Sequence, residues 1–416
     1  METVSESRLR QDLEANAEFG AIDADAGRGR TVHTGTEANR RARQHLVERM
    51  QDAGLDVTVD GVGNIAGTWT PESADPDAAP VAAGSHLDSV PEGGIFDGPL
   101  GVYAVLEAVR ARQDAGVEPA RPITVVSFTE EEGQRFASGL LGSSAAAGLQ
   151  AVEEALMLRD DDGTTLREAL ASIDFLGQGR LDASEWDAWL ELHVEQDTTL
   201  EEAGVPVGVV TTITGIAHYE ATVEGEANHA GATAMGERRD ALAAASEVVG
   251  DVERAAQEVV ATDSETAVAT VGSVDVQPNA TNVVPGQVEM GIDVRDVRRE
   301  TMDALADRVE KSLARVADAR GVETTLAREM VVDPAPMSDR VRNAAHDAGN
   351  RLGIGTKDLP SGAAHDTMHV ATQTDAALLF APSRDGISHN PREWTDWADC
   401  ATVTQVLAGT VADLAT

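Results

Sequence analysis

Residues 81–128 read VAAGSHLDSVPEGGIFDGPLGVYAVLEAVRARQDAGVEPARPITVVSF. Apolar runs at 81–85 and 122–128 flank an amphipathic pattern at 101–116. We expect the two runs to be buried strands and the segment between them to be a helix. Strands that alternate with helices predict an α/β domain, in which a mostly parallel sheet is flanked by helices on both faces.

The neighbouring segments extend this pattern. Apolar positions at helical spacing predict a helix over 36–53, and the alternation that follows predicts a strand pair over 55–69. Two more buried strands are expected at 188–196 and 376–380, the second followed by a final helix.

A different order begins near residue 213. The pattern there is β-α-β-β-α-β, which is typical of a self-contained α+β unit with two layers. The expected strands are 216–224, 266–276, 285–294 and 322–332, and the expected helices are 237–258 and 300–318. The chain should therefore form a larger domain from 1–212 and 333–416, with a smaller α+β domain inserted at 213–332.

The charge of the chain limits its partners. Among 416 residues, 72 are acidic and 32 are basic, so the formal net charge is −40. Such a surface repels nucleic acid and anionic membranes, and we expect neither as a partner. The acidic residues are spread over the whole length, which favours a halophilic protein solvated at high salt. The single cysteine, Cys400, excludes an intrachain disulfide and a thiolate metal site.

The sequence also bears on location. It has no apolar run as long as a membrane span and no signal for export at its start. We therefore expect a cytoplasmic, soluble protein.

Side chains that can bind metals follow several of the expected strands. His86 follows the strand at 81–85, and three glutamates, 130–132, follow the strand at 122–128. Ligands of such sheets gather at the carboxyl ends of the strands. Taken singly, each residue has a plainer explanation: a lone histidine is more often a core or surface residue, and glutamates in an acidic chain fit a solvated loop.

Taken together, five side chains form a ligand set of imidazoles and carboxylates. They are His86, Asp97, Glu132, His193 and His389. A set without thiolates favours Zn²⁺ or Mn²⁺, with Co²⁺ or Ni²⁺ as alternatives. Asp97 lies on a glycine-rich loop and could bridge two cations about 3.5 to 4 Å apart. The sequence therefore predicts two divalent metal ions per subunit.

Short motifs occur from about residue 20 to residue 400. They are DGVGNIAG, GSHLDSVPEGGIFDGPLGV, FTEEEGQRF, LELHVEQ, GEANHAGATAM, RRDAL, PNATNVVPG, DVRD, SGAAHD and PSRDGISHNPREW. In content and order they resemble those of the dinuclear zinc amidohydrolases, a family of N-carbamoyl-L-amino-acid hydrolases, allantoate amidohydrolases and β-ureidopropionases within the aminoacylase and carboxypeptidase clan. The resemblance implies a phosphorylase/hydrolase-like fold and a homodimer formed through the inserted lid domain.

The resemblance also implies roles for the ligand set. His86 and His193 would hold one metal ion, Glu132 and His389 the other, and Asp97 both. Further roles fall outside the ligands. Glu131 would be the general base, Asp88 would orient a ligand imidazole, and His229 would donate to the oxyanion, often from the partner subunit.

Substrate residues follow from the same resemblance. Gln196 would contact a ureido group, and Asn282 and Arg295 would bind a carboxylate, which a guanidinium can hold with two parallel hydrogen bonds. Gly362 and His365 are further candidates for substrate contact. Arg295 has an alternative explanation, a surface ion pair at the end of a strand.

The expected function is therefore that of a metal-dependent amidohydrolase with a small ureido-carboxylate substrate. It would cleave the carbamoyl C–N bond of an N-carbamoyl-L-amino acid and release the amino acid, ammonia and CO₂. Allantoate or ureidopropionate are alternative substrates. A peptidase or aminoacylase of the same clan, or a catalytically inactive binding protein, are the remaining alternatives.

Overall fold

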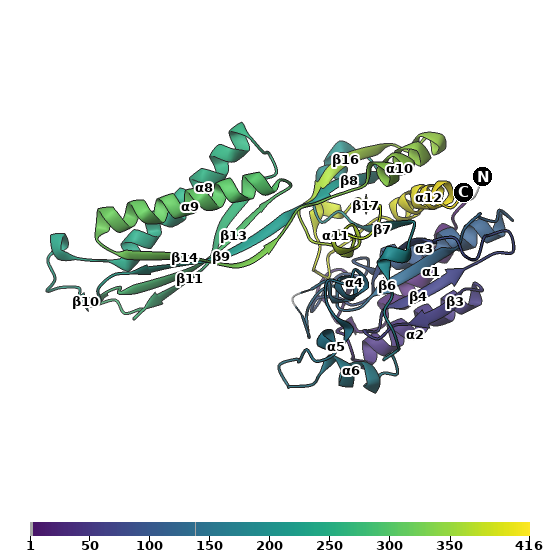
Figure 1. Ribbon diagram of the computed structural model, residues 1–416, viewed down its shortest axis with the longest axis horizontal. Helices are drawn as coiled ribbons and strands as arrows, with labels where there is room; N and C mark the ends of the chain where they lie inside the picture. Colours follow the sequence, from purple (N-terminus) through teal and green to yellow (C-terminus); the bar gives the residue numbers. More distant parts are fainter. Residues whose placement is uncertain (1–2, 138) are drawn as a thin grey trace. The chain divides into compact units, whose positions relative to one another are not determined.

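The chain divides into two compact units. The computed structural model describes residues 3–137 and 139–416. Unit 1 contains Met1–Thr211, Met337–Leu359 and Ala364–Thr416, and unit 2 contains Thr212–Pro336 and Pro360–Ala363 (Figure 1).

The larger sheet belongs mainly to unit 1 and has nine strands among the described residues. Its strands are β3 (Asp56–Val59), β4 (Ile65–Trp69), β5 (Val81–His86), β6 (Ile123–Phe128), β7 (Ala188–Val194), β8 (Val207–Ile213), β15 (Ala335–Pro336), β16 (Thr356–Ser361) and β17 (Ala376–Ala381). Their order is β15-β8-β17-β7-β5-β6-β4-β3, and β16 also pairs with β8. The central strands β17, β7, β5 and β6 are parallel, whereas β4 and β8 are antiparallel to their neighbours β6 and β17.

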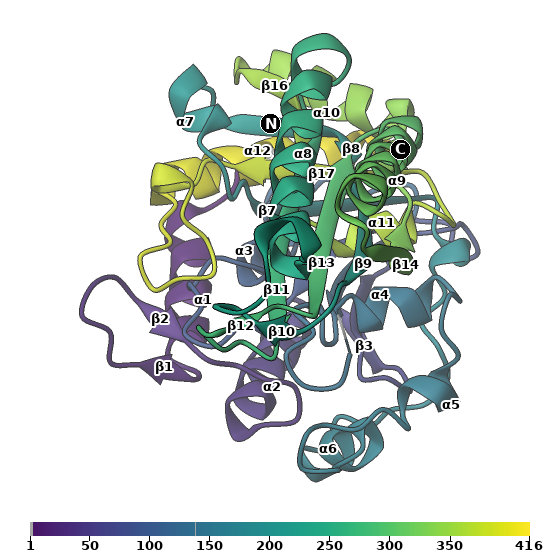
Figure 2. The same ribbon diagram turned by 90° about the vertical axis from the view of Figure 1, so that its left-hand side faces the viewer.

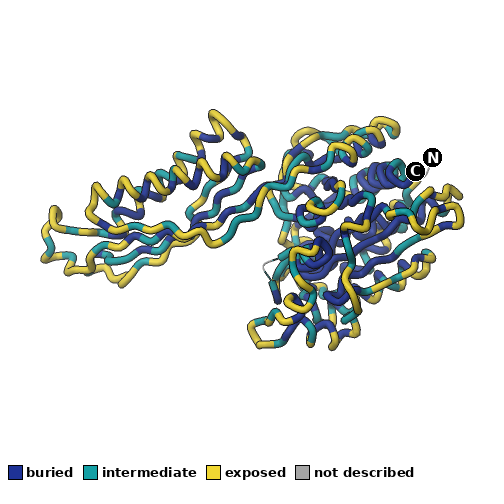
Figure 3. Tube along the Cα trace, viewed as in Figure 1, coloured by how far each residue is buried: buried dark blue, intermediate teal, exposed yellow. Residues whose placement is uncertain are grey.

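The helices of unit 1 are α1 (Glu6–Ala17), α2 (Glu37–Asp52), α3 (Pro99–Asp114), α4 (Leu141–Ala146), α5 (Val152–Ala155), α6 (Leu166–Ser172), α7 (Thr199–Ala203), α10 (Asp339–Leu352), α11 (Asp366–Val370) and α12 (Trp397–Leu414). A short ribbon of β1 (Ala21–Ile22) and β2 (Gly29–Arg30) lies near the start of the chain. Every residue of the four central strands is buried (Figure 3), because helices cover both faces of the sheet. This confirms the predicted α/β fold. No helix among the described residues has the length and apolar character needed to cross a membrane.

Unit 2 is a four-stranded antiparallel sheet with two long helices on one face (Figures 1 and 2). The strands are β9 (Gly215–Glu224), β11 (Val268–Gln277), β13 (Gln287–Asp296) and β14 (Glu323–Val332), and the helices are α8 (Ala241–Thr262) and α9 (Arg299–Arg320). Burial alternates along β9 and β13, so one face packs on the helices and the other is open. A ribbon of β10 (Asn228–His229) and β12 (Val283–Val284) completes the unit.

Candidate metal centre

The parallel strands of unit 1 place the predicted ligands at one edge of the sheet. His86 is the last residue of β5, and His193 is the last but one of β7. The glutamates 130–132 follow β6 directly. Because β5, β6 and β7 are parallel neighbours, their carboxyl ends lie together and these side chains converge.

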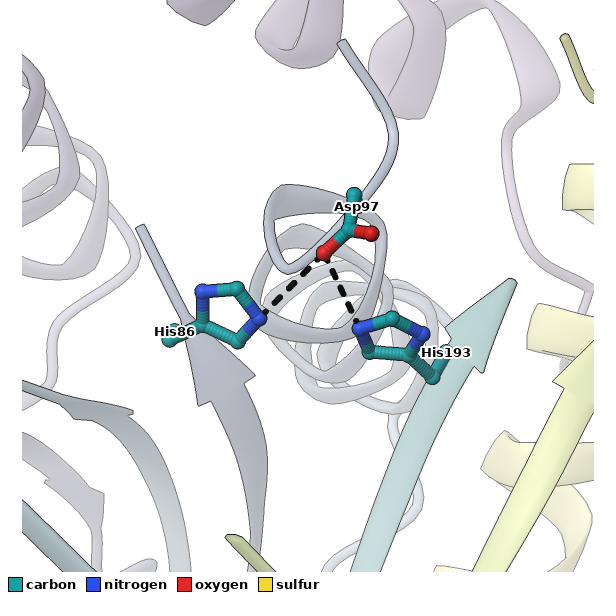
Figure 4. Close-up of side chains that lie close together, drawn as sticks. All are labelled: His86, Asp97 and His193. Carbon is teal, nitrogen blue, oxygen red and sulfur yellow. Dashed lines mark ion pairs between the residues drawn. The ribbon is translucent and has the colours of Figure 1, made fainter. Parts of the chain in front are cut away.

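Asp97 lies between two groups of side chains. Its Oδ1 atom is 3.5 Å from Nε2 of His86 and 3.2 Å from Nε2 of His193 (Figure 4). Its Oδ2 atom is 3.6 Å from Nε2 of His389, which in turn is 3.5 Å from Oε2 of Glu132. The four other predicted ligands therefore meet around the carboxylate of Asp97, whose two oxygens face different partners.

The imidazole of His86 tests whether this arrangement fits a cation. Its Nδ1 atom is 3.2 Å from the carbonyl oxygen of Asp88, which can only accept, so Nδ1 carries the proton. The Nε2 lone pair is then buried without a hydrogen-bond partner among the described residues. It faces carboxylate oxygens of Asp97 at 3.5 Å and Glu131 at 3.6 Å. A lone pair opposite carboxylates is repulsive unless a cation lies between them, so the donor set fits a divalent metal ion.

The charges of the carboxylates lead to the same result. The pKa of Glu131 is raised well above its ordinary value. Burial is the largest cause, and the negative charges of Glu132 and Asp366 follow. The pKa of Glu132 is also raised well above its ordinary value, mainly by burial and next by the negative charge of Asp97. Each raised pKa means that the negative form of the carboxyl group lacks a compensating positive charge, which a bound cation would supply.

Two features explain how the loop after β5 can approach the histidines. Gly98 has a φ of 80°, and a Cβ atom there would lie 2.6 Å from the ring of His86, so only glycine fits. Arg30 is fully buried and donates from its NH2 atom to the carbonyl oxygen of Leu87 at 2.7 Å. Reasoning from the sequence missed Arg30, because nothing in its local pattern marks a buried guanidinium.

Asp88 contacts both neighbouring ligand segments. Its Oδ2 atom accepts the backbone N–H of Glu132 at 3.1 Å. Its carboxylate is 3.7 Å from Nδ1 of His86, farther than its own backbone carbonyl. The backbone of Asp88, more than its carboxylate, therefore orients the imidazole in this structure.

Two predicted substrate residues also lie in unit 1. Gln196 has a φ of 60°, and its Nε2 atom donates to Oδ2 of Asp97 and to Oγ of Ser388, each at 3.1 Å. His365 is buried, with its ring centroid 4.6 Å from that of His193. Both side chains therefore contact the ligand set.

Unit 2 contains the other predicted residues in two groups. In the first, His229 pairs with Val283 in the ribbon of β10 and β12, next to Asn282. Nδ1 of His229 accepts from the backbone N–H groups of Gly231 at 3.0 Å and Ala232 at 3.2 Å. Its Nε2 atom is therefore the protonated one, and it can act as a donor.

The second group surrounds Arg295. Its Nε atom is 3.0 Å from Oδ1 of Asp293, and its NH1 atom donates to the carbonyl oxygen of Gly362 at 3.3 Å. Asp293 also pairs with Nε2 of His218 at 2.9 Å. The structure thus contains the ion pair that was the alternative explanation for Arg295.

Comparisons with known proteins show which chains this one is similar to. The model of peptidase family M20/M25/M40 matches residues 82–413. The chain is 41% identical over 402 residues to an N-carbamoyl-L-amino acid amidohydrolase of Geobacillus stearothermophilus, with 96% of each protein covered. It is 32% identical over 390 residues to an allantoate amidohydrolase of Bacillus subtilis (strain 168), with 92% of this chain and 91% of that one covered. It is also similar to the crystal structure of an amidase of the hydantoinase/carbamoylase family from Burkholderia multivorans, with a TM-score of 0.92 and 35% identity over 100% of this chain and 98% of the other.

Proposed function

The chain belongs to peptidase family M20/M25/M40, and we propose that it is an amidohydrolase that cleaves the carbamoyl C–N bond of N-carbamoyl-L-amino acids. The observation that supports this most is the convergence of four other predicted ligands on Asp97, in a chain 41% identical to an N-carbamoyl-L-amino acid amidohydrolase. Water would add to the carbamoyl carbon and one C–N bond would break, which leaves a carbamic acid. Loss of CO₂ from that acid breaks the second C–N bond, so the final products would be the amino acid, ammonia and CO₂.

We propose two divalent ions, Zn²⁺ first and Mn²⁺, Co²⁺ or Ni²⁺ as alternatives. His86 and His193 would hold one and Glu132 and His389 the other, with Asp97 shared between them. Bound there, the ions would lower the pKa of a coordinated water molecule toward neutrality.

Glu131 would then act as the general base. Its Oε2 atom is 3.6 Å from Nε2 of His86, so it borders the proposed cation site. It would accept a proton from the attacking water and deliver it to the departing nitrogen, as one carboxyl group can do in both steps.

The remaining side chains would bind the substrate. Gln196 would direct its amide to the ureido group. The hydrogen bond from its Nε2 atom to Asp97 places that amide beside the proposed metal ligands. Nε2–H of His229 would donate to the oxygen that becomes negatively charged. Asn282 and Arg295 would bind the carboxylate, and Gly362 and His365 would border the substrate. For Arg295 this requires that its guanidinium serve the substrate as well as Asp293.

The decisive experiment is an ammonia-release assay in high salt with added Zn²⁺ or Mn²⁺. Carbamoyl amino acids, ureidopropionate, allantoate and dipeptides are compared as substrates, with metal-free protein as the control. We expect the highest kcat/KM for carbamoyl amino acids. A higher kcat/KM for allantoate would instead indicate an allantoate amidohydrolase, as the Bacillus subtilis relative is named. Turnover of dipeptides alone would indicate a peptidase, and no turnover with bound metal would indicate a binding protein.

We also propose a homodimer formed through unit 2. β11 is an edge strand, and Val268 and Val274 on it are exposed, as are Leu242, Val249 and Val260 on α8. An edge strand with exposed apolar side chains is prone to pair with another chain. A second copy would cover these residues.

Light scattering after size-exclusion chromatography tests the dimer. We expect twice the subunit mass of 43.6 kDa, and a single subunit for Val274→Lys. Val117→Lys is the matched control, because Val117 is 44% exposed in unit 1 and Val274 is 49% exposed. A monomeric wild type, or a dimer that survives Val274→Lys, would contradict the proposed interface.

A cytoplasmic location is proposed as well, since the one cysteine, Cys400, is buried and free.

A further inference from the structure

Glu393 is a buried carboxylate that belongs to none of the ligand groups. It is 1% exposed and follows the ligand His389 by four residues. Its Oε1 atom accepts the backbone N–H groups of Phe96 at 3.1 Å and Asp97 at 3.0 Å. One side chain therefore joins the segment of His389 to the loop of Asp97.

Ser388 completes a second connection between the same segments. Its Oγ atom is 2.9 Å from Oε2 of Glu393 and 2.8 Å from Oδ2 of Asp97, and it accepts from Nε2 of Gln196 at 3.1 Å. Asp97 is thus held at its backbone N–H by Glu393 and at its carboxylate by Ser388.

Gly94 shows how closely the loop approaches Glu393. A Cβ atom at Gly94 would lie 2.1 Å from Oε1 and 2.6 Å from Cβ of Glu393. No side chain fits there without displacing the carboxylate. The loop is therefore shaped around Glu393.

We propose that Glu393 is a positioning residue, which fixes Asp97 and His389 relative to each other through hydrogen bonds so that both oxygens of Asp97 can bind cations. This inference rests on the metal site proposed above. Partners that hold a metal ligand in place contribute to affinity, and losing one weakens metal binding about 10- to 100-fold. Glu393 acts through geometry in this scheme, not through its charge.

The test compares Glu393→Ala with Glu393→Gln. A glutamine can still accept the N–H groups of Phe96 and Asp97 with its oxygen and donate to Ser388 with its amide. We expect Glu393→Ala to weaken Zn²⁺ and Mn²⁺ binding about 10- to 100-fold, and Glu393→Gln to bind nearly as the wild type does. Dissociation constants come from competition with a chelator. The control is Glu92→Ala, which removes an exposed glutamate from the same loop.

The possible results distinguish the proposed metal site from the proposed role of Glu393. If the wild type binds neither ion, the metal site itself is wrong. If the wild type binds and Glu393→Ala binds equally well, only the role of Glu393 is wrong. Equal losses in Glu393→Ala and Glu393→Gln would mean that the charge matters and would overturn positioning by hydrogen bonds.

A second variant covers the case in which Glu393→Ala does not fold. The melting temperature of metal-free protein reports folding without the ions. Ser388→Ala removes the hydroxyl contact with Asp97 and leaves the contacts of Glu393 with the backbone N–H groups. We expect it to weaken metal binding while the metal-free melting temperature stays near that of the wild type. Unchanged metal affinity in Ser388→Ala would overturn the part of the inference in which Glu393 acts on the carboxylate of Asp97 through Ser388.

Discussion

Three side chains around the candidate metal centre lie on backbone that non-glycine residues rarely adopt. Glu130, Gln196 and His389 have φ values of 56°, 60° and 53°. Such conformations cost about 1 to 3 kcal/mol each and persist only where contacts stabilise them. Oε1 of Glu130 accepts the N–H groups of Arg135 at 2.6 Å and Phe136 at 2.8 Å, which supplies such contacts. Strain concentrated at this edge of the sheet is typical of a functional site.

Glu131→Gln tests the chemistry at the scale of one atom. Glutamine keeps the shape of the side chain but removes the basic lone pair, so the proton of the attacking water has no acceptor. We expect kcat to fall about 10²- to 10⁴-fold, while the number of bound metal ions stays unchanged. Ammonia release and metal analysis on the same sample measure both quantities. Activity within tenfold of the wild type would show that another group is the base.

Much of this site could be predicted from residue types, but its supports could not. Imidazoles and carboxylates at strand ends indicated the side chains that converge around Asp97, since parallel strands end at one edge. Glu393 and Ser388 lie in the quoted motif PSRDGISHNPREW, yet no role was assigned to either. Their partner Asp97 is nearly 300 positions away, 296 from Glu393, and only the folded chain reveals that contact.

At the scale of elements, the loop with Asp97 begins where β5 ends, so its position depends on how β5 packs against β6. Gly84 in this strand is paired with Val126 of β6. A Cβ atom at Gly84 would lie 1.9 Å from the carbonyl oxygen of Val126. A neighbouring strand in the middle of a sheet cannot move away, because its own hydrogen bonds hold it.

We therefore expect Gly84→Ala to destabilise unit 1 by about 1 to 3 kcal/mol or more, as overpacking does. Gly355→Ala is the control, since Gly355 also lies in unit 1, directly before β16, and its Cβ atom would approach only a side-chain carbon of Val205, at 3.9 Å. That variant should be neutral or slightly stabilising. Calorimetric melting temperatures measure both. Equal melting temperatures for the two variants would mean that the sheet relaxes around the added methyl group.

Element boundaries followed from the sequence where local signals were strong. The alternation in unit 2 predicted strands close to β9, β11, β13 and β14, because one sheet face is open. The helix predicted from residue 237 begins instead at Ala241, after Asp240, whose side chain caps the backbone N–H of Ala243. The strand predicted over 188–196 ends at Val194. Gln196 turns into a left-handed conformation there, which its residue type does not indicate.

At the scale of the whole molecule, the net charge of −40 acts on every part of the fold. Arginines form exposed ion pairs, such as Arg315 with Glu247 and Asp251. Pairs of this kind contribute about 0 to 1 kcal/mol each, and acidic residues outnumber basic ones by 72 to 32. We therefore expect repulsion among the unpaired carboxylates to outweigh local attraction in dilute buffer.

We propose that the protein is halophilic and expect its melting temperature to rise by several degrees between 0.1 M and 2 M KCl. The Debye length falls from about 10 Å at 0.1 M to about 3 Å at 1 M salt, so repulsion between distant carboxylates is largely screened. Salt also weakens the exposed ion pairs, but each of these contributes only about 0 to 1 kcal/mol. A protein with near-zero net charge, melted in the same buffers, corrects for the general effect of salt on apolar burial. A melting temperature that stays constant or falls, relative to that reference, would mean that the acidic surface does not limit stability.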